Sequence, residues 1–195
     1  MDTEEKIEGE TGGGGEGGKV LNHIVRHPLS LSPPLPVVTS INISPGGIPK
    51  FPILVANVTS DGIQGDGRAH AKHVKLTRAI SLLEVHVIDA IRSEGYAVEP
   101  GAMGENLTVR GVDLQALAPG TRLWFTGGVE IELTEPRAPC FVLDAIHPDL
   151  KDAVRGRFGW MARVVTPGVL RAGEAIEVSS QVIAHSSQEN LAPIF

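Results

Sequence analysis

Cysteine is almost absent from this 195-residue chain, which contains only Cys140, and aromatic residues make up only 4% of it. A single thiol cannot close an intrachain disulfide, so nothing in the sequence indicates an oxidising compartment. No apolar run approaches the length of a membrane-spanning helix, and the first residues are acidic where a signal or transit peptide would be basic or hydroxyl-rich. We therefore expect a cytoplasmic protein with no membrane partner.

The chain also lacks a basic excess. Its formal net charge is -6, of which residues 1–18 carry -5, so the other 177 residues carry only -1. A nucleic-acid surface needs a surplus of cations because it contacts many phosphates. The sequence thus predicts no nucleic-acid partner, and it leaves room for a small basic pocket that binds one anionic cofactor.

Composition divides the chain into three parts. Residues 1–18 are rich in glycine and glutamate and lack apolar periodicity, which predicts a disordered acidic tail. Residues 19–36 mix apolar residues with four prolines and are expected to form an N-terminal arm. Residues 37–195 should form one domain, since the hydrophobic content of 42% supports one good core.

Short strands dominate the expected domain. Each combines β-branched or alternating apolar residues with a turn of glycine, proline, serine or aspartate. Two of them are separated by Gly127-Gly128, as in a hairpin. The expected strands are residues 37–43, 51–58, 107–110, 121–126, 129–134, 161–165 and 175–179.

Two helices are expected between the strands. Ser81 and Glu84 have the spacing of a capping box at the start of the first helix, and Gly95 is suited to its end. Residues 148–154 predict a shorter helix with Pro148 in its first turn. Many short strands with few helices indicate a mainly β fold, a barrel or a sandwich.

Cys140 ends the run Thr-Glu-Pro-Arg-Ala-Pro-Cys. Pro136 and Pro139 fix their own φ angles and favour extended residues before them, which predicts a stiff turn at a strand exit. The nearby Arg137 guanidinium favours the thiolate, the form that attacks sulfur or binds a soft metal. The alternative is that Cys140 is a small buried hydrophobic residue.

Three further clusters combine glycine with polar residues. In residues 44–50, the backbone of Gly46 and Gly47 with the ammonium of Lys50 could seat an anion or simply form a hairpin turn; the order of residues is not that of a Walker motif. Residues 65–73 contain Arg68, His70 and His73. The two histidines share a helical face, but no third ligand stands nearby, so no zinc site is predicted.

The third cluster, residues 100–108, places Glu105 and Asn106 at a strand entrance, where they either point into a cleft or cap a turn.

Taken in order, these clusters resemble the MOSC family, the molybdenum cofactor sulfurase C-terminal domain. The resemblance extends from about residue 38 to residue 178 and rests on Gly-Glu-Asn-Leu-Thr and Arg-x-Pro-Cys at family-like spacing, followed by residues 159–165 and 169–173. It implies a MOSC-like β-barrel whose cysteine faces a cleft. In the family's large members this domain follows a pyridoxal-phosphate desulfurase, receives its sulfur and binds the molybdopterin cofactor. Members similar to the amidoxime-reducing proteins hold molybdenum through the cysteine and reduce N-hydroxylated compounds.

By this resemblance Cys140 is the sulfur carrier or molybdenum ligand, and Arg137 supports it. The residues expected around the molybdenum cofactor are Glu105 and Asn106 in the cleft, and Gly46, Gly47, Lys50, Arg68, His70 and His73 at its anionic end. The chain departs from the family where many relatives have His-Gly-Gly, because Val74 and Lys75 follow His73 here. Loss of both glycines predicts a differently shaped pocket or a changed ligand.

The resemblance implies partners as well. A cysteine desulfurase would supply sulfur, or an electron-donor protein would supply electrons, since no flavin, haem or iron–sulfur motif is visible. The chain has no room for a desulfurase domain, so it is expected not to bind pyridoxal phosphate. A different class of function also stays open, a non-catalytic barrel that binds another anionic ligand in the same cleft.

Overall fold

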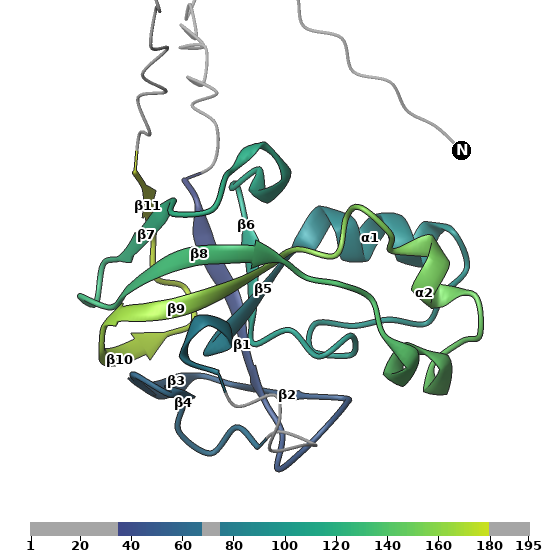
Figure 1. The fold of residues 1–195 in the computed structure, drawn as a ribbon, viewed down its shortest axis with the longest axis horizontal. Helices are drawn as coiled ribbons and strands as arrows, with labels where there is room; N and C mark the ends of the chain where they lie inside the picture. Colours follow the sequence, from purple (N-terminus) through teal and green to yellow (C-terminus); the bar gives the residue numbers. More distant parts are fainter. Residues whose placement is uncertain (1–34, 68–74, 180–195) are drawn as a thin grey trace, which may run out of the picture. The chain divides into compact units, whose positions relative to one another are not determined.

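The computed structural model describes residues 35–67 and 75–179, all within a compact unit that comprises residues 33–195 (Figure 1). The helices are α1 (Val85–Ser93) and α2 (Leu150–Ala153), with 3-10 turns η2 (Leu76–Arg78), η3 (Leu114–Ala116) and η4 (Phe141–Ala145). The strands are β1 (Val37–Ile43), β2 (Phe51–Ile53), β3 (Val55–Thr59), β4 (Gly62–Ile63), β5 (Ile80–Glu84), β6 (Leu107–Arg110), β7 (Arg122–Phe125), β8 (Glu130–Pro136), β9 (Trp160–Thr166), β10 (Gly168–Arg171) and β11 (Ile176–Val178).

The strands form one large mixed sheet and one small sheet. The eight-stranded sheet has the order β11-β7-β8-β9-β5-β6-β1-β2, and the three-stranded sheet has the order β10-β3-β4. Among the described strands, only β5 and β6 pair in parallel, and α1 connects them. In the described ranges no full ladder closes the large sheet, but an isolated bridge joins Val37 at the start of β1 to Ala175 before β11. The predicted mainly β class is confirmed.

The main core lies against the large sheet. Six of its strands, β1, β5, β6, β7, β8 and β9, contribute side chains with no exposed surface. Strand β5 is buried along its whole length because other strands flank it and α1 contacts it. Examples of these buried side chains are Ile41, Ile80, Leu82, Leu107 and Leu133. The ring of Trp160 packs in this core, and its Nε1 donates to the carbonyl oxygen of Leu114 at 2.7 Å.

A second core joins the helices. In Figure 1, α1 and α2 lie at the same end of the sheet. Val87, Ile88 and Ile91 of α1 pack in one cluster with Leu150 of α2 and Leu143 of η4. Since η4 begins directly after Cys140, this cluster fixes the segment that carries the cysteine.

The strand predictions hold best where the pattern is local. Residues 37–43 and 107–110 are strands over their full predicted length, and the β7–β8 hairpin turns at Gly127-Gly128 as expected. The predicted strand 51–58 is split at Leu54 into β2 and β3, which belong to different sheets.

The predicted start of the first helix is wrong. Ser81 and Glu84 do not form a capping box, because residues 80–84 are strand β5 and α1 begins only at Val85. The helix does end where predicted, with Gly95 just after it at φ 99°. The second helix is shorter than the predicted 148–154, since α2 covers only Leu150–Ala153. Within residues 35–67 and 75–179, no helix is long and apolar enough to cross a membrane.

Candidate functional site

Cys140 lies on the protein surface. Strand β8 ends at Pro136, and Cys140 is the residue that precedes η4, in extended conformation. Its side chain is exposed, which contradicts the alternative that it is a buried hydrophobic residue. The backbone is held on both sides, because Arg137 N donates to Gly159 O at 2.9 Å and Leu143 N donates to Cys140 O at 3.2 Å. A fixed backbone thus presents an accessible thiol.

Cys140 lines a cavity of about 300 Å³, which we call the cysteine cavity. Its wall is largely apolar, with one carboxylate and two guanidinium groups. The lining residues are Arg78, Met103, Glu135, Pro136, Arg137, Ala138, Pro139, Cys140, Val142, Phe158 and Met161.

The second cavity, of about 200 Å³, adjoins the first. We call it the lysine cavity. Its lining residues are Gly47, Ile48, Lys50, Asp66, Gly67, Arg78, Ala79, Ser81, Met103, Gly104, Asn106, Arg137, Val142 and Met161. The two cavities share Arg78, Met103, Arg137, Val142 and Met161. Cys140 and Asn106 therefore lie on either side of a common wall, although they are far apart in the sequence.

Arg137 is the central residue of this common wall. Its Nη2 donates to Met103 O at 2.8 Å, its Nη1 donates to Phe158 O at 3.4 Å, and its Cζ lies 4.0 Å from the centroid of the Phe158 ring. Burial lowers the pKa of Arg137 to about 10, while the charges of Glu105 and Cys140 act in the opposite direction. Arg137 stays protonated at neutral pH and brings a positive charge close to the thiol.

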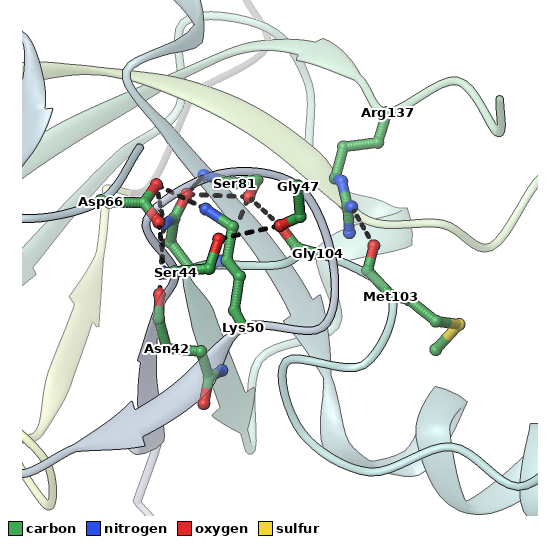
Figure 2. A network of polar contacts seen from close by, with 10 residues as sticks. Asn42, Ser44, Gly47, Lys50, Asp66, Ser81, Met103, Gly104 and Arg137 are labelled. Carbon is green, nitrogen blue, oxygen red and sulfur yellow. Dashed lines mark hydrogen bonds and ion pairs between the residues drawn. The ribbon is translucent and has the colours of Figure 1, made fainter. Parts of the chain in front are cut away.

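Lys50 and Asp66 form an ion pair at the far end of the lysine cavity, the end away from the cysteine cavity. Lys50 Nζ lies 2.5 Å from Asp66 Oδ2, and the two side chains are only 10% and 7% exposed. Asp66 also accepts from Asn106 Nδ2 at 2.8 Å and from Ser44 N at 3.0 Å. Figure 2 shows Lys50, Asp66 and Ser44 together, with Arg137 and Met103 apart from them.

Asn106 connects this ion pair to β5. Its Oδ1 accepts from Ser81 N at 3.1 Å and from Ser81 Oγ at 3.0 Å. Ser81 Oγ is also within 3.2 Å of Gly104 O, and the Ser81 side chain is buried. The hydroxyl that the sequence suggested as a helix cap therefore holds the site's amide in place.

Glu105 is buried and lines neither of the two cavities. Its side chain is 0% exposed, and its Oε1 accepts from Gly101 N at 2.5 Å and from Thr108 Oγ1 at 3.2 Å. Its Oε2 is buried and has no hydrogen-bond partner among the described residues. Burial raises the pKa of the Glu105 carboxyl, and the Arg137 charge opposes that rise.

The glycine turn is only partly at the site. Gly47 lines the lysine cavity with φ 79°, whereas Gly46 is exposed and is not a lining residue. Gly67 packs against the same turn, because its N donates to Ser44 O at 2.6 Å. The predicted site residues Arg68, His70 and His73, together with Val74, lie outside the described residues.

Asp66, Met103 and Arg78 are among the lining residues that were not identified from the sequence. Asp66 and Met103 belong to the clusters at residues 65–73 and 100–108, from which other residues were predicted to be site residues. Arg78 follows the cluster at residues 65–73, which contains the two histidines. Arg78 donates to Glu135 through Nε at 2.6 Å and through Nη2 at 2.7 Å. No local sequence pattern predicts an ion pair such as Arg78–Glu135, because its two residues come from distant segments of the chain. Among residues 35–67 and 75–179, no group of three or more histidine, cysteine or acidic side chains could hold a metal ion.

Comparison with known proteins gives a family match and several relatives. The model of the MOSC domain matches residues 69–177, more than half of the chain. Protein YiiM of Escherichia coli is 31% identical over 93 residues, which are 45% of this chain and 41% of that protein. A protein named Reductase from Gibberella moniliformis is 30% identical over 129 residues, which are 62% of this chain and 23% of that protein. The chain thus spans less than half the length of either relative.

Solved structures support the fold. The YUAD protein from Bacillus subtilis superposes with a TM-score of 0.63 at 21% identity, over 74% of this chain and 95% of that one. YiiM from Geobacillus stearothermophilus superposes with a TM-score of 0.63 at 23% identity, over 76% of this chain and 77% of that one. At these identities the likeness concerns the arrangement of the chain alone.

Proposed function

Because this chain belongs to the MOSC domain family, we propose that it binds the molybdenum cofactor in the two adjoining cavities, with Cys140 at the reacting end. One observation carries the proposal. An exposed thiol lines a cavity that shares its wall, including Arg137, with a second cavity lined by Lys50 and Asn106.

The residues present fit such a group. Molybdenum in a dithiolene complex is soft enough to favour a thiolate ligand, and Cys140 is accessible. Within the part of the chain that the structure describes, the charged lining residues of the two cavities are Lys50, Arg78 and Arg137 against Asp66 and Glu135, an excess of one positive charge that suits an anionic cofactor. At Gly47 no atom lies within 4 Å of the position that a Cβ would take, which leaves the turn open to a ligand.

In this proposal Cys140 either ligates molybdenum or carries sulfur. When bound, the cofactor would supply two-electron redox chemistry. Reduction of an N-hydroxylated compound consumes two electrons and two protons, and it releases the amine and water. A separate donor protein would deliver the electrons. The fungal relative named Reductase supports this first role.

As a carrier, Cys140 would accept sulfur from a cysteine desulfurase as a persulfide. The two roles leave different products after cyanide treatment. Cyanide takes the outer sulfur of a persulfide and releases thiocyanate, whereas a thiolate that ligates molybdenum has no such sulfur to give. Arg137 would serve both roles by placing a positive charge in the wall of the cavity that Cys140 lines.

The proposal is tested by metal and pterin analysis. The full chain is purified from a host that makes the cofactor, and its molybdenum and its fluorescent pterin oxidation products are measured per mole of protein. We expect both in similar amounts. Protein that carries neither, yet binds another anion in these cavities, would favour the alternative of a non-catalytic binding domain.

A further inference from the structure

The charge at the far end of the lysine cavity is already compensated. The ammonium of Lys50 lies against the Asp66 carboxylate at 2.5 Å, and both side chains are at least nine-tenths buried. Asp66 is in turn fixed by Ser44 N at 3.0 Å and by Asn106 Nδ2 at 2.8 Å. This carboxylate therefore cannot swing away when a ligand enters.

An anion that binds beside Lys50 and Asp66 gains little electrostatic free energy. A unit negative charge about 4 Å from the ammonium is attracted by about 4 kcal/mol at an effective dielectric constant of about 20. The Asp66 carboxylate adjoins that ammonium, so its repulsion cancels most of this attraction. A phosphate would also bring only acceptor oxygens to a carboxylate that needs donors.

A group that donates hydrogen bonds fits this end better. An ionised carboxylate has about four lone-pair positions. Among the described residues, Asp66 accepts from three donors, Lys50 Nζ, Asn106 Nδ2 and Ser44 N, which leaves one position. Asp66, Asn106 and Ser81 all line the cavity. A neutral heterocycle with N–H groups on its edge matches such a lining.

Arg137 offers the opposite chemistry at the common wall. It donates to the carbonyl oxygens of Met103 and Phe158, so among the cations in the described lining it is the one without a carboxylate hydrogen-bond partner. Arg78, by contrast, is paired with Glu135 in a bidentate manner. Among the described lining residues, the cation that no carboxylate pairs with is therefore Arg137, next to the cysteine cavity.

From this distribution we propose that the end of the lysine cavity formed by Lys50, Asp66 and Asn106 binds the neutral pterin edge of the cofactor, and that the anionic part of the cofactor lies toward Arg137. This assignment rests on the proposed function and differs from the sequence-based expectation that Lys50 contacts the anionic end.

The test uses pterin itself, which carries neither phosphate nor dithiolene, and the cofactor-free full chain. Pterin fluorescence is titrated with the wild type and with Asp66→Asn. We expect saturable binding by the wild type and a dissociation constant about tenfold or more higher for the variant, because a charge-assisted hydrogen bond is lost. Inorganic phosphate should not displace pterin from the wild type.

Glu132→Gln is the matched control, since Glu132 also pairs with arginines but lies outside both cavities. It should bind pterin as the wild type does. If Asp66→Asn does not fold, Lys50→Met combined with Asp66→Asn removes both charges together and should show the same loss. No pterin binding by the wild type, or equal binding by the folded Asp66 variant, would overturn the assignment.

Phosphate that displaces pterin, with displacement abolished by Lys50→Met, would overturn it too. These outcomes are independent of molybdenum content. A chain that retains molybdenum but fails the pterin test contradicts this assignment and leaves the proposed function standing. A chain that binds pterin but never retains molybdenum contradicts the proposed function and leaves the lysine cavity as a site for a neutral pterin.

Discussion

Arg137 lies over the ring of Phe158, with Cζ 4.0 Å from the ring centroid, while its Nη2 holds the carbonyl oxygen of Met103 at 2.8 Å. One side chain thus ties the wall between the two cavities to the segment before β9. A planar guanidinium can stack on the ring and donate to both carbonyls at once, whereas an ammonium cannot.

We therefore predict that Arg137→Lys lowers the free energy of unfolding by about 1–3 kcal/mol and also lowers molybdenum retention, although the charge is kept. Urea denaturation and metal analysis check the two effects. Arg155→Lys is the control, because Arg155 is 73% exposed and pairs only with Asp152. A variant equal to the wild type in both measurements would show that the charge alone matters.

Alanine substitutions at two glycines of the turn should differ in their effect on stability, because one glycine is tightly packed and the other is exposed. A Cβ on Gly67 would lie 1.8 Å from Pro45 O, whereas a Cβ on Gly46 would meet nothing within 4 Å. We expect Gly67→Ala to cost about 3 kcal/mol or more, because backbone must move. Gly46→Ala should change stability by less than about 1 kcal/mol. Thermal unfolding of both variants checks this, and equal melting temperatures would contradict the described turn.

Glu105 should make stability depend on pH. Burial raises its pKa in the folded protein above the unfolded value of about 4.3. As the pH rises through this window, the unfolded state releases its proton first, so the free energy of unfolding falls. In Glu105→Gln this contribution is absent, and the stability of the variant relative to the wild type should rise from about pH 4.3 upward. Denaturation across a pH series checks it, and parallel profiles would show that Glu105 does not titrate in this window.

The exposed thiol should react in the native state. We expect iodoacetamide to modify Cys140 in cofactor-free protein at a rate close to that of urea-unfolded protein, because the side chain is accessible. Cofactor-loaded protein should be protected. Mass spectrometry over time gives both rates. Equal rates with and without cofactor would place the ligand away from Cys140.

How well the sequence predicted the structure depended on the range of the interactions involved. Strands 37–43 and 107–110 were predicted at full length because their alternation and bounding turns are local. The Ser81–Glu84 spacing suggested a helix start, but the Ser81 backbone pairs with Met161 and its hydroxyl bonds to Asn106, contacts 80 and 25 residues away that no local motif reveals.

For the candidate site, too, the features that depend on local sequence were predicted and those that depend on long-range contacts were not. The run of prolines before Cys140 was enough to predict an extended, presented cysteine. The pairing of Lys50 with Asp66 and the burial of Glu105 could not be predicted, because both depend on how three segments meet around one cavity. The roles expected for Arg68, His70 and His73 stay predictions, since these residues lie outside the described ranges.

The most direct test of the account is the molybdenum content of Cys140→Ser beside that of the wild type, both purified from a host that makes the cofactor. Because the side chain is exposed, the substitution should change the free energy of unfolding by less than about 0.5 kcal/mol. We predict a wild type that retains molybdenum and an equally stable variant that does not retain it, or that no longer accepts sulfur if Cys140 is a carrier. An equally stable variant with undiminished molybdenum and sulfur acceptance would contradict it.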